Sequence, residues 1–161
     1  MANYTGANVI NAGDASNYQA DIYTFGIGAD TSEVAFFITQ TTNDILRQLR
    51  IEWWPVYKTN VFTDITVLNT AEMDNTKVNL DQFERAGIYL FLGRFYLPAL
   101  TKFRPETEKD RFERMAEYYM SEYNKEWRSI LEDGVEYDAT ADGTIQVSER
   151  EPLHGYRRLT R

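Results

Sequence analysis

The sequence predicts a mainly α-helical protein: a small bundle of three principal helices with an extended N-terminal arm, a short β segment or hairpin, and an extended C-terminal tail. Three observations lead to this class. Three segments repeat apolar residues at three- and four-residue steps, each has cap, proline or glycine signals at its ends, and only short stretches suit strands. At 161 residues with 43% hydrophobic residues, the chain has the size of one domain and contains no apolar run near the ~20 residues of a membrane span.

Residues 1–29 are predicted to form an irregular N-terminal arm. This stretch is rich in Asn, Gly, Ala and Tyr and has no sustained apolar period. A packed but loop-like start to the domain is an equal alternative, because the aromatic side chains of Tyr18, Tyr23 and Phe25 need cover.

A bundle domain is predicted over residues 30–134, and its first helix begins at Asp30. Asp30 and Glu33 have the spacing of a capping box, and apolar residues then recur at helical steps: Val34, Phe37, Ile38, Ile45, Leu49 and Trp53. The helix should stop at Trp54, because Pro55 disfavours helical backbone in the residue before it. The stretch NVFTDITVL that follows is β-branched and predicts a short strand or extended crossing segment, and NTAEMDNTK predicts a loop.

The second helix is predicted to open with Asn79 as its cap and to run through LDQFERAGIYLFLGRFYLPAL, with Pro98 kinking or ending it. Beyond Ile88 its apolar residues cover most of the circumference. This pattern is typical of a helix buried centrally or by a neighbouring subunit. Gly87 and Gly93 each cost about 1 kcal/mol relative to Ala inside a helix, so close packing is expected at both positions.

The third helix is predicted from Pro105, which suits a first turn, to Gly134, which suits a C-terminal cap. An apolar stripe runs along it, and helical spacing indicates core packing rather than a cofactor site. The stripe consists of Phe112, Met115, Ala116, Tyr119, Tyr123, Trp127, Ile130 and Leu131.

Residues 135–161 are predicted to form a turn and a partner-binding C-terminal tail. The turn, DATADGTIQVSE from Asp138 to Glu149, has the residue spacing of a calcium-binding EF-hand loop. The expected ligands are Asp138, Thr140, Asp142, the Thr144 carbonyl, Gln146 through water, and Glu149. Thr140 stands where Asp or Asn is usual, so the predicted structural calcium would bind with a dissociation constant on the order of 10⁻⁴ M or weaker.

The same turn also suits a metal-free hairpin around Asp142 and Gly143, with Val135, Tyr137, Ile145 and Val147 alternating. A calcium sensor needs long helices directly on both sides of its loop. Here Gly134 should end the incoming helix early and Pro152 follows soon after the loop. A structural turn before the tail is therefore favoured over a switch.

The composition argues against several classes of function. The chain has no cysteine and a single histidine, His154, so thiolate sites, multi-histidine zinc sites and a Ser-His-Asp triad are improbable. The net charge of -8 argues against sequence-specific nucleic-acid binding. Carboxylate pairs such as Asp64 with Glu72 or Asp74 are expected by chance among 25 acidic residues, and no glycine-rich phosphate loop accompanies them, so we predict no enzyme and no other cofactor. The start MANYTGANVI has neither the cationic residues nor the apolar core of an export signal, and the lack of a long apolar run predicts no membrane partner.

The predicted tail is basic in an otherwise acidic chain. Its expected partner-binding residues are Arg150, Leu153, Tyr156, Arg157, Arg158, Leu159 and Arg161. An extended segment with such alternating anchors can add to a partner's sheet edge or lie in its groove. A frayed, solvated terminus is the alternative interpretation.

The order of these parts resembles the head-to-tail adaptor proteins of tailed bacteriophages. The resemblance runs from about Asp30 onward and consists of a helix ending IEWW, a long helix with DQFERAGIYLFLGRFYLPAL, a third with RFERMAEYYMSEYNKEWRSIL, an Asp-rich DxxxDGxxxxxE turn, and a terminal YRRLTR. The long Asn- and Gly-rich N-terminal stretch departs from the family pattern and leaves the partner of that end open.

The resemblance implies a structural virion protein, made in the host cytoplasm and located at the head-tail junction. Such proteins form a homo-oligomeric ring, typically of twelve subunits, that binds the portal protein through terminal arms and receives a neck or tail protein. The apolar stretch from Ile88 to Leu97 suits this role, since we expect it to exceed what a three-helix monomer can hide, so that identical neighbours cover it. A stand-alone calcium-binding helical module is the rival hypothesis.

Overall fold

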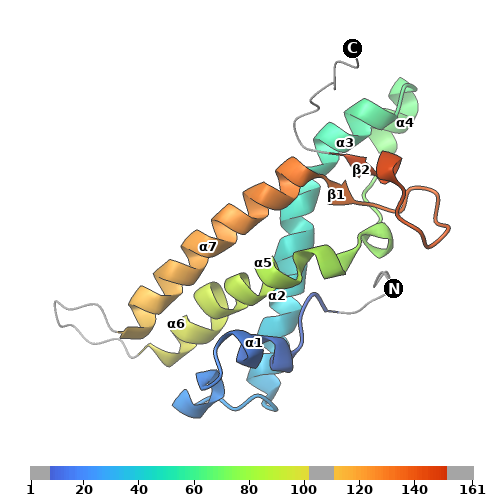
Figure 1. Cartoon of the computed structure of the whole chain (residues 1–161). Coiled ribbons are helices and arrows are strands. Elements are labelled where there is room, and N and C mark those ends of the chain that lie inside the picture. The colour runs from blue at the N-terminus through green and yellow to red at the C-terminus, as the bar shows by residue number, and fades with distance from the viewer. Residues whose placement is uncertain (1–7, 102–110, 152–161) are drawn as a thin grey trace.

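The computed structural model describes residues 8–101 and 111–151 and is mainly helical (Figure 1). The helices α5 and α6 run alongside α7, α2 crosses them, and α1 lies at the opposite end of the molecule from α3 and α4. Among the described helices, none combines the length and apolarity that a membrane crossing requires.

The N-terminal region is folded rather than irregular. Helix α1 (Ala12–Tyr18) begins with a capping box, in which the Asn11 side chain accepts from the Gly13 and Asp14 amides and the Asp14 carboxylate accepts from the Asn11 amide. A 3-10 turn (Ile22–Phe25) follows. The prediction of an irregular arm is therefore wrong for this part of residues 1–29, and the physical reason is burial of its apolar side chains: Val9, Ile10, Ala15 and Ile22.

Helix α2 (Ser32–Glu52) is confirmed, with a different cap from the one predicted. Thr31, not Asp30, is the N-cap, and its hydroxyl accepts from the Val34 amide at 3.3 Å. Trp53 separates α2 from helix α3 (Trp54–Val61). Pro55 thus lies in the first turn of a new helix, where the missing N–H costs no hydrogen bond.

The predicted strand in NVFTDITVL is wrong, because this stretch completes α3 and then forms helix α4 (Ile65–Thr70). The Asp64 side chain caps α4 by accepting from the Thr66 amide at 2.8 Å. This local cap prevails over the β propensity of Ile65, Thr66 and Val67. A loop follows, as expected, with one 3-10 turn (Asn75–Lys77).

The second principal helix is continuous but changes its hydrogen-bonding pattern. It consists of a 3-10 turn (Leu80–Phe83), helix α5 (Glu84–Leu90), a π-helical segment (Phe91–Tyr96) and helix α6 (Leu97–Leu100). Asn79 is the cap, as predicted, and accepts from the Asp81 amide. Pro98 falls in the first turn of α6, and the helix ends two residues later.

The chain buries this central helix by itself, so the expectation that identical neighbours must cover Ile88 to Leu97 is wrong. Helices α2 and α7 contact it, and the folded N-terminal region supplies the remaining cover. The Tyr96 hydroxyl lies 3.0 Å from the Ile22 carbonyl oxygen and 2.6 Å from that of Ile27. The most deeply buried side chains of the helix are Phe83, Ile88, Leu90, Phe91, Leu92, Tyr96 and Leu97.

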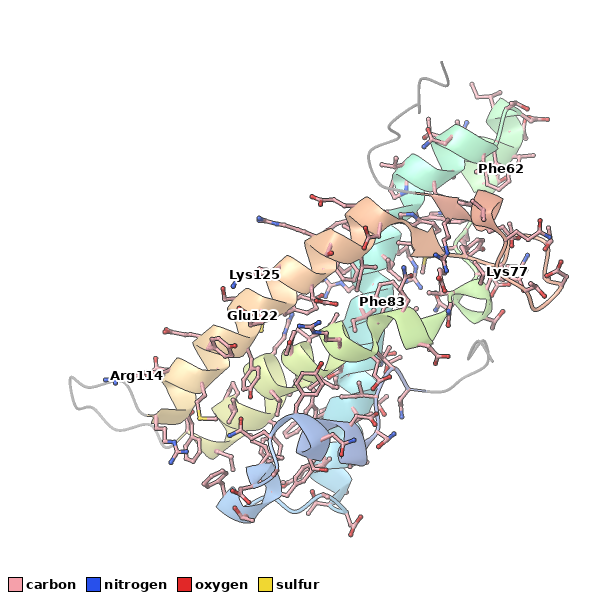
Figure 2. The ribbon with its side chains drawn as sticks, viewed as in Figure 1. Phe62, Lys77, Phe83, Arg114, Glu122 and Lys125 are labelled. Atoms are coloured by element: carbon pink, nitrogen blue, oxygen red, sulfur yellow. The ribbon has the colours of Figure 1, made fainter. Side chains whose placement is uncertain are left out.

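Helix α7 (Arg111–Asp133) presents its predicted stripe to the core, whereas Pro105 lies outside the described residues. Six stripe residues are buried and Phe112 and Met115 are partly buried. The Trp127 ring packs on Phe83 at 5.9 Å between centroids and donates its Nε1 hydrogen to Glu52 of α2. In Figure 2, Phe83 points into the space beside α7, whereas Glu122 and Lys125 lie on the outer side of that helix.

A short β segment follows α7, as predicted, but its register differs from the expected hairpin. Strand β1 (Val135–Glu136) pairs antiparallel with β2 (Arg150–Glu151), so the expected pairing partners Ile145 and Val147 are not strand residues. Val147 is 91% exposed. Tyr137 also forms a bridge with Val78, which fixes this region to the loop before the central helix.

Close packing at Gly93 generates a prediction. An ideal Cβ at this position would lie 2.9 Å from the backbone nitrogen of Met120 in α7. Gly93→Ala should therefore lower the free energy of unfolding by on the order of 1–2 kcal/mol despite the better helix propensity of Ala, because α7 would have to move. Urea denaturation would measure the loss.

Gly28→Ala is the matched control, because its Cβ would meet its nearest atom at an ordinary 3.8 Å. That variant should stay within about 0.5 kcal/mol of the wild type. Equal stability of both variants would contradict the close-packing explanation.

Candidate functional site

The predicted metal-binding loop is organised around the buried carboxylate of Asp138. Asp138 accepts hydrogen bonds from the amides of Asp142 (3.2 Å) and Gly143 (2.8 Å). Ala141 and Gly143 adopt left-handed backbone (φ 59° and 80°), which turns successive amides toward the same carboxylate. The loop thus folds over an acid at its first position.

Glu149, also buried, closes the loop from its other end. It accepts from the amides of Thr140 (3.0 Å) and Gln146 (2.9 Å). The Thr140 hydroxyl lies 3.2 Å from Glu149 and 3.3 Å from Asp138, so it stands between the two carboxylates. Thr140, which departs from the EF-hand pattern, therefore joins the two ends of the loop.

Both carboxylates are held in their ionised form. Burial tends to raise the pKa of Asp138, but amide hydrogen bonds from Gly143, Ala141 and Asp142 together outweigh it and lower the pKa below its ordinary value. For Glu149, the amide hydrogen bond from Gln146 is the largest cause of a lowered pKa. The charges are thus stabilised by the loop's own N–H donors.

The structure brings together part of the predicted calcium set. Asp138, Thr140 and Glu149 meet through hydrogen bonds, whereas the Asp142 carboxylate accepts from the Thr144 amide at 2.8 Å and from the exposed Gln146 side chain. Within residues 8–101 and 111–151, no group of three or more acidic or histidine side chains is placed to hold a metal ion. The calcium site therefore stays a prediction.

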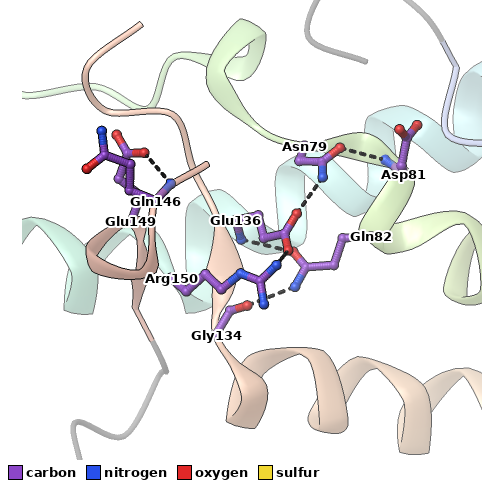
Figure 3. A network of polar contacts seen from close by, with 8 residues as sticks. All are labelled: Asn79, Asp81, Gln82, Gly134, Glu136, Gln146, Glu149 and Arg150. Atoms are coloured by element: carbon purple, nitrogen blue, oxygen red, sulfur yellow. Dashed lines mark hydrogen bonds and ion pairs between the residues drawn. The ribbon is translucent and has the colours of Figure 1, made fainter. Parts of the chain in front are cut away.

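A polar network fixes the base of the loop to the start of the central helix (Figure 3). The Gln82 side chain donates to the Gly134 carbonyl (2.8 Å) and accepts from the Glu136 amide (3.0 Å). Asn79 donates from its side chain to the Glu136 carboxylate, which also pairs with Arg150. Strand β1 is thus held by side chains from residues 79–82.

Arg150 is the one predicted partner-binding residue that lies within the described part of the chain. Its guanidinium pairs with Glu136 of the same chain, although half of its side chain stays exposed. This contact gives Arg150 a structural role in β1–β2 pairing. The other predicted residues, Leu153, Tyr156, Arg157, Arg158, Leu159 and Arg161, lie outside the described residues.

Sequence reasoning did not predict a tyrosine surface where α1, α5 and α7 meet. The tyrosine seam consists of Tyr18, Tyr89, Tyr118 and Tyr119, whose successive rings lie 5.4–6.0 Å apart. Tyr18 is 47% exposed and Tyr118 is 60% exposed. Arg85 lies over the Tyr89 ring and donates to its hydroxyl. Tyr118 could have been recognised because it falls outside the apolar stripe of α7.

A shallow hollow lies on the other side of the central helix and encloses about 170 Å³. Its lining residues come from α2 and from the central helix: Asp44, Arg47, Gln48, Ile51, Glu52, Leu90 and Arg94. Arg94 lies 3.4 Å from Asp44, and the Tyr123 hydroxyl donates to Gln48 beneath. Ile51 is largely exposed at its edge. The hollow therefore combines apolar and charged side chains, and two of its charges pair with each other.

A third unpredicted surface is the α3–α4 knob, defined as residues 59–76, at the end of the molecule shown at the upper right of Figure 1. None of the α4 residues is buried. Ile65 is 72% exposed, and Val61 and Val67 are 43% and 42% exposed. The knob is anchored through Trp54, which contacts Phe62 and donates its Nε1 hydrogen to the Ala71 carbonyl.

Comparison with known proteins does not identify the chain: no protein-family model, no curated protein and no solved structure matches it.

The lowered pKa values of Asp138 and Glu149 generate a pH prediction. Each charge stabilises the fold fully above the unfolded-state pKa values of about 3.9 and 4.3, and this contribution is lost as the pH falls through the lower folded values. Asp138→Asn with Glu149→Gln should therefore unfold at lower urea than the wild type at pH 7. The gap should narrow as the pH falls below about 4. A gap that is constant down to pH 2 would contradict this account.

The calcium hypothesis generates a second prediction, with Trp54 as reporter because its ring lies 5.6 Å from that of Tyr137, next to Asp138. With a dissociation constant of about 10⁻⁴ M, 10 mM calcium should raise the free energy of unfolding by about 2.7 kcal/mol. Asp142→Asn, which keeps an acceptor for Thr144 but loses a charged ligand, should reduce the gain. Unchanged Trp fluorescence and stability at 10 mM calcium would exclude the site.

Proposed function

We propose that this protein is a structural virion component, a head-to-tail adaptor that forms a homo-oligomeric ring between the portal and the neck or tail of a tailed bacteriophage. The proposal rests on the resemblance in element order and on one structural observation, the exposed tyrosine seam. Catalysis has no part in this role.

The tyrosine seam has the composition of a protein interface. Tyrosine and arginine are enriched at interfaces because they offer large contact areas with polar ends. Tyr18 and Tyr118 stay exposed in the single chain although Tyr89 and Tyr119 beside them are buried. A neighbouring copy that covered Tyr18 and Tyr118 would extend an aromatic cluster that already exists, without rearrangement of the core.

A ring needs two different contact surfaces on each subunit, because in a head-to-tail interface one surface of a subunit binds a different surface of the next. The seam lies where α1 and α7 meet over the central helix, and the hollow at Ile51 lies along α2. In the proposed ring, the seam of one copy faces the α2 side of the next. The basic segment from Leu153 to Arg161 is left to engage the portal.

The rival role, a stand-alone calcium-binding module, is less well supported. Helix α7 ends at Asp133, five residues before Asp138, and the loop itself ends in a 3-10 turn (Val147–Glu149). Within the described residues, only β2 follows the loop. With β1 just before the loop and β2 directly after it, the loop lacks the paired helices that a calcium sensor opens. A bound ion would then pin a turn, not operate a switch.

The seam makes the adaptor proposal testable. Tyr118→Ser should prevent assembly of rings, either by the protein alone or on cognate portal rings. Its melting temperature should stay within about 2 °C of the wild type, because the Tyr118 side chain is mostly exposed to solvent in the single chain. Negative-stain electron microscopy and sedimentation velocity would measure assembly.

Ser129→Ala, an exposed substitution elsewhere on α7, is the control and should assemble normally. If wild-type protein stays monomeric alone and fails to bind portal rings, the adaptor proposal is wrong. If rings form equally well with Tyr118→Ser, the ring is built without the seam.

A further inference from the structure

The loop from Asp138 to Glu149 brings two negative charges together at its ends. The side chains of Asp138 and Glu149 are both buried and lie on either side of Thr140. Two buried carboxylates repel each other unless positive charge or hydrogen-bond donors lie between them. In a calcium-binding loop the ion supplies the positive charge. The donors between these two carboxylates therefore decide whether the loop can close before any ion binds.

One hydroxyl lies between the two carboxylates. Oγ1 of Thr140 is 3.2 Å from Oε1 of Glu149 and 3.3 Å from Oδ1 of Asp138. A hydroxyl carries one proton, so it donates to one of the two carboxylates at a time and can alternate between them. The Thr140 amide adds a second donor, 3.0 Å from the same Glu149 oxygen. Through these contacts, residue 140 holds the first and last positions of the loop together.

Backbone amides of the loop occupy the other carboxylate oxygens. Oδ2 of Asp138 accepts from the Gly143 amide at 2.8 Å, and Oε2 of Glu149 accepts from the Gln146 amide at 2.9 Å. Every oxygen of the two carboxylates therefore has a donor from the loop itself. A calcium ion would need Asp138 and both oxygens of Glu149 as ligands, so it would compete with these donors.

The backbone beside Thr140 indicates that these contacts constrain the loop. Ala141 adopts left-handed backbone with φ 59°, which is uncommon for a residue with a Cβ. Such a conformation persists where the surroundings impose it. On one side of Ala141, the Thr140 amide is fixed to Glu149, and on the other, the Asp142 amide donates to Asp138 at 3.2 Å. Ala141 is thus held between two residues that are anchored to the two carboxylates.

Closure of the loop also positions strand β2. Glu149 directly precedes β2, and its carbonyl oxygen accepts from the Tyr137 amide at 3.2 Å. The pairing of Glu136 with Arg150 continues the same ladder. The contacts that join residues 138 and 149 therefore lie directly beside the pairing of the two strands, so that a closed loop brings β2 to β1.

We propose that Thr140 is a latch that closes this loop in place of a metal ion, so that the residue at position 140 decides whether β2 is positioned by the chain alone or only after a cation has bound. The hydroxyl can do this because it places a donor between two carboxylates without adding charge. An aspartate at this position, as in the usual EF-hand pattern, would add a third carboxylate and make closure depend on calcium. The latch concerns the loop alone and does not rest on the adaptor proposal.

Hydrogen exchange of the loop amides in the full chain, measured in EDTA, tests the latch. Thr140→Val keeps the shape of the side chain and its amide but removes the hydroxyl. Exchange at Asp142, Gly143 and Gln146 should then be about tenfold faster than in the wild type, because a hydrogen bond to a charged group is lost. Thr140→Ser keeps the hydroxyl and should stay within about twofold of the wild type. The amides of α7 are the internal reference and should exchange at the same rate in all three proteins.

The same measurement in about 10 mM calcium separates the latch from an ion. Calcium should change exchange in the wild-type loop by less than about twofold, because the loop is already closed, which is the opposite of what the calcium hypothesis expects. Thr140→Asp should exchange about tenfold faster than the wild type in EDTA, since its carboxylate repels the two acids beside it. Calcium should slow exchange in this variant about tenfold.

Equal exchange in the wild type and in Thr140→Val in EDTA would overturn the proposal. A wild-type loop whose exchange calcium slows about tenfold would also overturn it, because closure would then belong to the ion. Both measurements use the monomer without portal, so their outcome is separate from that of the ring assembly test.

Discussion

A helix that is apolar around most of its circumference must be covered on most of its sides, and this constraint organises the fold. The helix from Leu80 to Leu100 receives its cover from α2, from α7 and from the N-terminal region around α1. Gly87 and Gly93 allow two of these neighbours to approach closely, since an added Cβ would collide with Val9 at the first and with Met120 at the second. The π-helical segment adds a residue to the turn and thereby shifts the phase of the side chains that follow, including Tyr96, which reaches the Ile22 and Ile27 carbonyls.

The three long helices could be predicted because their period and caps are local properties of the sequence. The short helices α1, α3 and α4 could not, although α1 and α4 each carry a readable cap. Asn11 and Asp14 form the capping box of α1, and Asp64 caps α4, but small polar residues in the first and β-branched residues in the second conceal any helical period. Apolar periodicity measures how much one helix must bury. It does not reveal that a segment without periodicity, such as the N-terminal region, can cover that helix. The expectation that identical neighbouring subunits must bury the central helix was therefore too strong.

The candidate site, too, could be predicted from the sequence only in part. The spacing of acids in the loop predicted that Asp138 and Glu149 belong to one turn, and they do meet, because amide donors between them are oriented by left-handed residues at 141 and 143. The pairing of Arg150 with Glu136 depends on strand register, which two-residue strands do not specify in sequence. Surface features such as the tyrosine seam depend on which helices become neighbours, so they need the assembled fold.

The order in which the cover is synthesised has a consequence for biogenesis. The N-terminal cover and α2 precede the central helix, but the last residue of α7 follows Leu100 by 33 residues. At about 5–20 residues per second, the ribosome needs a further 2–7 seconds to produce that helix. During this interval the aromatic side of the central helix that later contacts Tyr119, Tyr123 and Trp127 has no intramolecular partner. This side of the central helix can therefore be covered within the chain only after α7 has been synthesised.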